Sequence, residues 1–386
     1  VTSIQGWGPN DQCGTGAVRG VYLGNGAMLC GFTVTNGRTM TTGTSLDVCG
    51  AGVLSGSDGI SSNCVLIGNR AWSSGGGGYF LGGKLQSCIL KANTAGAFGG
   101  GVYCKNSIVQ NCTVSGNNAG SVGGGVSCDS SIIENCTLTG NNADSTGGGV
   151  SCRSGSLVTN SVLRNNTARF GGGAECYYGT LVDCSMSGNS AIGTTLNGGG
   201  GAYLLYGTLS LCVLSSNDSV GPYGGGGVFC DSGSSVMDSI VTGNRAIAYN
   251  GRGGGVSCFM NCAVQNCVLS SNVAKVGGGV YCHAGGTVEN CTVSANTATN
   301  GGGAYCDSSG MLRNCLLSYN VATNGGGAYL LPGGTLQNCT VVSNVAKATG
   351  GGVYVTGGLL SNCIIYCNNA VVSNNYRGGA LVWSCS

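Results

Sequence analysis

Charged residues, histidine and proline are all scarce in this sequence, and it contains no long apolar run. Lys and Arg number 15, Asp and Glu 13, and His 1, so charged residues are 7% of the chain, against a usual share of about 25%. This scarcity argues against a nucleic-acid-binding patch and leaves few groups for acid–base chemistry. With 3 Pro and no Gly at every third position, collagen is excluded. No apolar run approaches the roughly 20 residues that a membrane-spanning helix needs.

Glycine and cysteine are abundant instead, with 78 and 25 residues, and both recur at a fixed interval. Segments similar to Asn-Cys-Thr-Val-Ser-Gly-Asn repeat with a step of about 24 residues, for example at Cys88, Cys112 and Cys136. An earlier turn at Gly31, with Asn36 at the same offset as later Asn residues, brings the count to about 14 coils. A hydrophobic content of 42% with a net charge of +2 disfavours disorder. The chain is therefore expected to be a repeat protein.

Each repeat carries two short strand signals and no helical one. Apolar residues alternate after the Gly triplet, as at Val126 and Cys128, which is the period of a strand with one buried face. Short strands with Gly-rich corners pair best with their copies in the next coil. The predicted fold is therefore all-β, a right-handed parallel β-helix of about 14 coils of roughly 24 residues. An Asn five residues after each anchor is expected to form an amide ladder along the helix. These are Asn69, Asn93, Asn117, Asn141, Asn166, Asn189, Asn217, Asn244, Asn272, Asn296, Asn320, Asn344 and Asn368.

The repeat also suggests how the chain is organised. Residues 1–30 are expected to form strand-rich first coils, and residues 31–386 a continuous β-helix with longer corner loops at about 192–255. The corners at 194–199, 219–224 and 247–253 should protrude on consecutive coils, which makes them one place to look for a ligand site.

Several repeat motifs resemble a known family. Gly303-Ala304-Tyr305, Gly379-Ala380-Leu381 and Val114-Ser115-Gly116-Asn117 are similar to the GGA-[ILVY] and F-x-x-N repeats of the chlamydial polymorphic outer-membrane proteins and related right-handed β-helix proteins. The likeness runs from Val21 through nearly the whole chain. It implies the parallel β-helix fold.

Most cysteines fall into two columns, one at the anchor and one after the Gly triplet. Three uses are open: stacked thiols in the core, a set of disulfides, or metal ligands. Ser161 and Ser239 replace anchor cysteines without a matching loss in the other column, which favours small buried thiols over obligate bridges. The single His and the lack of CxxC pairs disfavour metal. The columns include Cys88, Cys112, Cys136, Cys267, Cys291 and Cys315 at the anchor, and Cys104, Cys128, Cys282 and Cys306 after the triplet.

Four tyrosines form the candidate binding site. Tyr281, Tyr305, Tyr329 and Tyr354 occupy one outward position in four successive coils, and an exposed aromatic stack could take a sugar chain or a neighbouring subunit. The alternative is that the rings only stabilise the sheet.

Charged residues stack in other coils. Lys105, Asp129 and Arg153 follow one another at a single repeat position, and His283 precedes Asp307 by one coil. A Ser-His-Asp site built on His283 and Asp307 is disfavoured because no oxyanion pocket is visible. No catalytic residue, metal or cofactor is predicted.

These features together predict a non-enzymatic extracellular or cell-surface protein, structural or adhesive. A surface with little charge favours end-to-end assembly of copies into a filament or surface fibre. A β-helix that binds or cleaves polysaccharide, as a lyase or hydrolase, and a monomeric adhesin passenger are the alternatives. The expected partners are other copies of the chain, with glycans or cell surfaces as further candidates. Neither nucleic acid nor a membrane span is expected.

Overall fold

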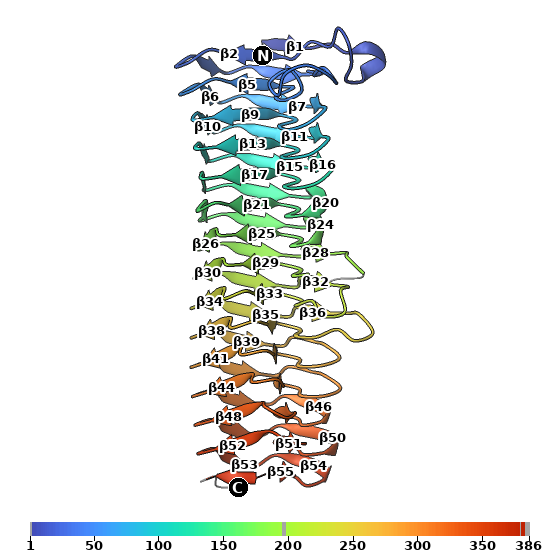
Figure 1. Cartoon of the computed structure of the whole chain (residues 1–386), viewed down its shortest axis with the longest axis vertical. Coiled ribbons are helices and arrows are strands. Elements are labelled where there is room, and N and C mark those ends of the chain that lie inside the picture. Colours follow the sequence, from blue (N-terminus) through green and yellow to red (C-terminus); the bar gives the residue numbers. More distant parts are fainter. Residues whose placement is uncertain (1, 195–197, 379, 383–386) are drawn as a thin grey trace. The chain divides into compact units, whose positions relative to one another are not determined.

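The computed structural model describes residues 2–194, 198–378 and 380–382. It divides into two compact units, Val1–Asn189 and Ser190–Ser386, and each is a stack of short strands that pair in parallel with the coil before and the coil after (Figure 1). The chain is all-β, with parallel sheets in about 13 solenoid turns of about 24 residues and about 1% helix. This confirms the predicted parallel β-solenoid, with about 13 turns in place of the expected 14, and its right hand stays a prediction. The division expected at residue 30 stays a prediction.

One coil of the first unit shows the construction. It contains β15 (Thr113–Ser115), β16 (Asn118–Ala119), β17 (Val126–Asp129) and β18 (Ile132–Glu134). Each strand pairs with its copy in the next coil, so that Val126 lies opposite Val150 on β21 (Val150–Arg153). Alternate residues point inward, and Val126 and Cys128 are 0% and 1% exposed. The period of two therefore builds a core of aligned apolar side chains.

The first coil differs from its prediction by one residue. Thr33 pairs with Val65, which places Phe32 at the anchor position and Gly37 at the Asn position. The expected Gly31 and Asn36 were wrong because Phe32, and not a cysteine, stands at the anchor position of this coil. Gly37 donates its N–H to Asn69 Oδ1 at 2.8 Å, so the amide ladder begins at Asn69.

The predicted amide ladder is present in both units. Asn117 Oδ1 accepts the N–H of Asn93 at 2.9 Å and its side-chain amide at 3.0 Å. Its own amide donates to Leu90 O at 3.0 Å and to Asn141 Oδ1 at 2.9 Å. Each ladder side chain thus satisfies backbone and side-chain groups of neighbouring coils inside the core.

A second row of amides, which the sequence pattern did not predict, runs along the surface of the second unit. In successive coils of this unit the residue before the anchor is an Asn with a left-handed backbone, with φ of 55° at Asn266, Asn290 and Asn314. Their side chains join coil to coil, with Asn290 Nδ2 donating to Asn266 Oδ1 at 3.4 Å and Asn314 Nδ2 to Asn290 Oδ1 at 3.3 Å. Asn tolerates this conformation better than other residues with a side chain.

The anchor cysteines also have a hydrogen-bonding role. Cys112 Sγ accepts the N–H of Cys88 at 3.4 Å, and its S–H donates to the carbonyl two residues earlier at 3.2 Å. Where the chain has Ser161, its Oγ accepts the N–H of Cys136 at 3.1 Å and donates to the equivalent carbonyl at 2.8 Å. From Cys64 onward the column therefore suits a small group that both accepts and donates, which explains why serine replaces cysteine there.

All ten cysteines named for the two columns are buried free thiols: Cys88, Cys104, Cys112, Cys128, Cys136, Cys267, Cys282, Cys291, Cys306 and Cys315. Burial raises the pKa of Cys104 well above its ordinary value, so this side chain remains a protonated thiol in the core.

We expect Cys112→Ser to change the free energy of unfolding by less than about 1 kcal/mol, because the hydroxyl replaces both hydrogen bonds. Cys112→Val should destabilise by about 1–3 kcal/mol, because the buried N–H of Cys88 loses its acceptor. Urea unfolding of the two variants measures this difference. Equal stability of the two variants would contradict the hydrogen-bonding role.

Candidate functional site

The candidate site lies on the outward face of one sheet in the first unit. Its strands are β9 (Gly78–Leu81), β13 (Val102–Lys105), β17, β21 and β25 (Ala174–Tyr177). One outward position is aligned from strand to strand in the order Tyr79, Tyr103, Ser127, Ser151 and Glu175. The aromatic column thus stops at Tyr103.

This interruption leaves one face of a tyrosine ring open. The rings of Tyr79 and Tyr103 stack at a centroid distance of 4.9 Å and an interplanar angle of 15°, which matches the spacing of paired strands. Tyr79 therefore covers one face of the Tyr103 ring. On the other side stands Ser127, whose side chain is too short to cover the second face.

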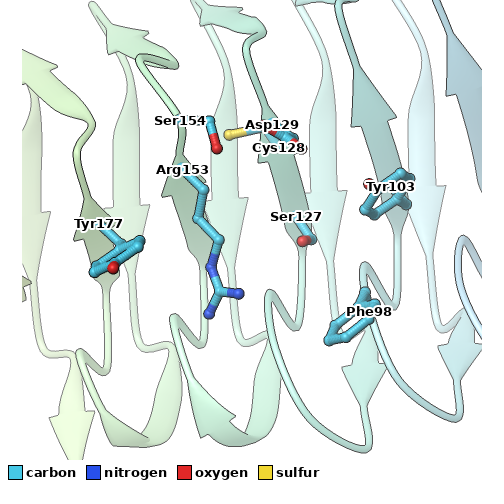
Figure 2. Close-up of a pocket in the computed structure, with 8 residues that line it drawn as sticks. All are labelled: Phe98, Tyr103, Ser127, Cys128, Asp129, Arg153, Ser154 and Tyr177. Carbon is cyan, nitrogen blue, oxygen red and sulfur yellow. The ribbon is translucent and has the colours of Figure 1, made fainter.

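A hollow of about 280 Å³ occupies the place of the missing rings. Figure 2 shows Tyr103, Ser127, Arg153 and Tyr177 on neighbouring strands, with the Arg153 guanidinium between Ser127 and Tyr177. This volume is close to the lower end of ordinary ligand pockets, about 300 Å³, so it suits a ligand the size of a sugar ring. We call it the serine hollow; it is lined by Phe98, Tyr103, Ser127, Cys128, Asp129, Arg153, Ser154 and Tyr177.

The hydroxyl of Ser127 is an open polar group in this hollow. The residue is 5% exposed, and its Oγ makes no hydrogen bond to any of the residues that the structure describes. Ser127 lines the hollow, so its hydroxyl can donate to and accept from a ligand bound there. Burial and the neighbouring Tyr79 and Asp129 raise the pKa of Tyr103 to about 12, so its phenol is a neutral donor and acceptor at physiological pH.

Arg153 and Glu175 form the charged part of the hollow's surroundings. Arg153 Nη2 lies 3.0 Å from Glu175 Oε1, and Arg153 Nε lies 3.2 Å from Glu175 Oε2. Glu175 is 4% exposed, and it also accepts a hydrogen bond from Ser151 Oγ. This bidentate pair fixes the guanidinium and neutralises it at close range. The predicted stack of Lys105, Asp129 and Arg153 is in register, with Lys105 Nζ 3.9 Å from Asp129 Oδ2.

The four tyrosines expected to form the site lie in the second unit and use their ring faces differently. They are in register on β40 (Val280–Cys282), β43 (Ala304–Cys306), β47 (Ala328–Leu330) and β51 (Val353–Val355). The expected exposure was wrong for Tyr281, which is 0% exposed, whereas Tyr305, Tyr329 and Tyr354 are half-buried. Their centroids are 5.7, 5.1 and 4.9 Å apart in chain order. The first two contacts are stacked, at interplanar angles of 27° and 12°, whereas Tyr354 meets Tyr329 edge-on at 85°. Both faces of the Tyr305 ring are therefore covered by its neighbours, which favours the stabilising role for this ring over a platform for sugars.

Tyr281 is buried by charged and polar neighbours. The Arg252 guanidinium lies 4.7 Å from the centre of its ring and also contacts its hydroxyl. That hydroxyl donates to Asp307 Oδ2 at 3.0 Å, and the other oxygen of Asp307 is hydrogen-bonded to His283 Nδ1. Burial, followed by the charge of Asp307, raises the pKa of Tyr281, so the phenol stays protonated and is a poor acid.

The Ser-His-Asp interpretation of the second unit lacks its nucleophile. Ser257 is the register neighbour of Tyr281, but its hydroxyl donates to Arg252 O at 2.9 Å and not to His283. The pair of His283 and Asp307 therefore holds Tyr281 in place.

Two of the protruding corners lie where the sequence placed them, after β32 (Asp218–Ser219) and β36 (Arg245–Ala246). Arg252, from the second of these corners, also lies over the ring of Tyr223, at 4.3 Å, from the first. In the predicted corner at 194–199, residues 195–197 lie outside the described residues.

Metal sites and membrane-spanning helices are two other features that the described parts of the chain lack. In residues 2–194, 198–378 and 380–382, no three His, Cys, Asp or Glu side chains are grouped so that they could hold a metal ion. Over the same residues, no helix has the length and apolar character needed to cross a membrane.

A scan against family models and a comparison with curated protein sequences each give no match. Solved structures similar to this chain include a glycosylated fragment, a tailspike and an adhesin. A hyper-glycosylated TibA fragment has 16% identity over 80% of this chain and 97% of that chain, with a TM-score of 0.30. The Dettilon tailspike protein has 12% identity over 88% and 68%, with a TM-score of 0.38. PfbA, a surface adhesin of Streptococcus pneumoniae, has 10% identity over 94% and 85%, with a TM-score of 0.25.

Likenesses at these identities and TM-scores carry no argument about function. The resemblance to the chlamydial family stays a resemblance, while the parallel β-helix that it implied is observed. The sequence pattern did not predict the serine hollow, because the prediction used only positions that recur in every coil. The sequence does contain a signal, which is a change of residue type at one repeat position. That position holds Tyr79 and Tyr103 in two coils and then Ser127, Ser151 and Glu175 in the next three.

Proposed function

We propose that this protein is a non-enzymatic, extracellular β-solenoid that binds carbohydrate and acts as an adhesin. The observation that carries the proposal is the serine hollow, in which an open face of the Tyr103 ring lies beside the unpartnered hydroxyl of Ser127. A sugar ring has an apolar face that stacks on an aromatic ring and hydroxyls that need partners at its edge. The hollow offers both, with Tyr177 on the opposite side (Figure 2).

Binding is better supported than cleavage. Hydrolysis of a glycosidic bond usually needs two carboxyl groups, one of which must carry a proton to the leaving oxygen. Both oxygens of Glu175 are already engaged, one by Arg153 Nη2 and the other by Ser151 Oγ, and Glu175 is not among the residues that line the hollow. Asp129 remains as a single carboxylate lining the hollow. Cleavage of a bound polysaccharide is therefore the second candidate.

Binding to immobilised polysaccharides, followed by titration calorimetry with fragments of those that bind, tests the proposal. Tyr103→Leu should weaken binding roughly 3- to 10-fold, because the stacking face is lost while the apolar contact with Tyr79 is kept. Tyr305→Leu, a matched change in a ring that is stacked on both sides in the second unit, should leave the affinity unchanged. Equal affinities of the two variants would place the sugar elsewhere, and release of reducing ends would favour the enzyme.

End-to-end assembly into a filament, expected from the scarcity of surface charge, stays part of the proposal for a surface fibre. Electron microscopy of the purified protein over a range of concentrations tests it, and particles of a single size throughout would contradict it.

A further inference from the structure

The charges around the serine hollow bear on which sugars it accepts. An arginine beside a sugar site would by itself favour acidic sugars, because the guanidinium fork pairs with carboxylate and sulfate groups. In this protein that edge of the guanidinium is already hydrogen-bonded, because Nε and Nη2 of Arg153 lie 3.2 and 3.0 Å from the carboxylate oxygens of Glu175. A second carboxylate would have to displace Glu175, a side chain that is almost fully removed from water.

The charges of Asp129 and Lys105 also disfavour an acidic ligand. Asp129 lines the hollow, and its ion pair with Lys105 is longer, at 3.9 Å. An acidic ligand would thus meet the carboxylates of Asp129 and Glu175, while Arg153 and Lys105 only balance the charges already present. Like charges brought close together repel, and the repulsion is stronger near Glu175, whose side chain is 5% exposed, than near Asp129, at 30%. The N–H groups of Arg153 that do not face Glu175 can still donate to neutral hydroxyl oxygens.

We propose that the serine hollow selects neutral sugar rings over uronic acids, and that Glu175 determines this specificity by neutralising Arg153. The ligand is a neutral hexopyranose unit of a glycan, stacked on Tyr103 with its hydroxyls bonded to Ser127 Oγ and to the outward N–H groups of Arg153. This inference rests on the proposed carbohydrate binding and gives it a ligand class.

The test compares neutral oligosaccharides with uronate oligosaccharides of the same length and ring stereochemistry: glucose with glucuronate, galactose with galacturonate, and mannose with mannuronate. The wild-type protein should bind the neutral member of the preferred pair at least about tenfold more tightly. Glu175→Gln keeps the shape of the side chain but leaves Arg153 uncompensated, so it should raise affinity for the uronate at least about tenfold and remove the preference. Added salt should weaken this gained binding.

Glu289→Gln is the matched control, because it removes the same charge from an ion pair with Arg313, 2.8 Å long, in the second unit. It should leave both affinities unchanged. Wild-type binding to the neutral sugar should also be independent of ionic strength, which tests the inference without any variant.

Each outcome has one meaning. Wild-type protein that binds the uronate as tightly as the neutral sugar, or a folded Glu175→Gln variant with unchanged preference, overturns the neutral selectivity and leaves carbohydrate binding intact. If Glu175→Gln does not fold, salt-sensitive binding of the wild type overturns the inference and salt-insensitive, neutral-selective binding supports it. If no neutral or acidic glycan binds, the proposed function fails and the inference fails with it.

Discussion

Replacement of Asn117 by Ala will lower the free energy of unfolding by about 3–5 kcal/mol, because the ladder amide serves several buried groups that cannot reach water. The substitution removes the acceptor of the Asn93 N–H and side-chain amide. It also removes the donor to Leu90 O and to Asn141 Oδ1. Each buried group left without a partner costs about 1–3 kcal/mol, less whatever relaxation of the coils recovers. Urea unfolding followed by circular dichroism measures the loss.

Asn118→Ala is the matched control, since the change is the same and the residue is the next in sequence. Asn118 is half-exposed, and its Oδ1 accepts one hydrogen bond, from Asn142 Nδ2 at 2.8 Å. Loss of such a bond should cost about 1 kcal/mol or less. If the two variants unfold at the same urea concentration, the buried ladder does not stabilise the coils.

Gly124→Ala should lose more than about 4 kcal/mol or fail to fold, because the coils approach too closely to admit a methyl group. A Cβ at this glycine would lie 2.3 Å from Asn142 O and 2.5 Å from Gly148 O. Both atoms belong to backbone fixed by the parallel pairing of the next coil, so neither can move without breaking ladder hydrogen bonds. Soluble yield and the urea midpoint of the variant give the result.

Gly116→Ala separates this steric effect from backbone strain. Gly116 has a φ of +61°, and a Cβ at this position would have no atom within 4 Å, so alanine should cost only the strain of a left-handed residue, about 1–2 kcal/mol. A Gly124→Ala variant as stable as Gly116→Ala would show that the glycine triplets are not required for close approach of the coils.

Features that depend on the period could be predicted from the sequence. The step of about 24 residues aligns identical positions of successive coils, and the amide ladder and the two thiol columns follow from that alignment. The register of the first coil was missed because Phe32 stands where later coils have cysteine or serine. The hydrogen-bonding role of the cysteines became visible only when the atoms around Cys112 and Ser161 were placed.

Features that depend on irregular segments could not be predicted in the same way. Tyr281 is buried because Arg252, from a long corner, reaches across its ring, and no repeat position encodes that contact. The serine hollow depends on Arg153 turning toward Glu175 on the next strand rather than toward Asp129 in its own column. Around Tyr281 and in the serine hollow alike, the local structure departs from the repeat. In each case the rotamer of one arginine, Arg252 or Arg153, determines which neighbouring side chains are exposed.

The most direct test of the carbohydrate-binding account is a crystal structure of the protein with a neutral oligosaccharide that binds it. The account predicts a sugar ring in the serine hollow, stacked on the open face of Tyr103, with a hydroxyl within hydrogen-bonding distance of Ser127 Oγ. A sugar bound elsewhere with the hollow empty, or bound through a carboxylate to Arg153, would contradict it.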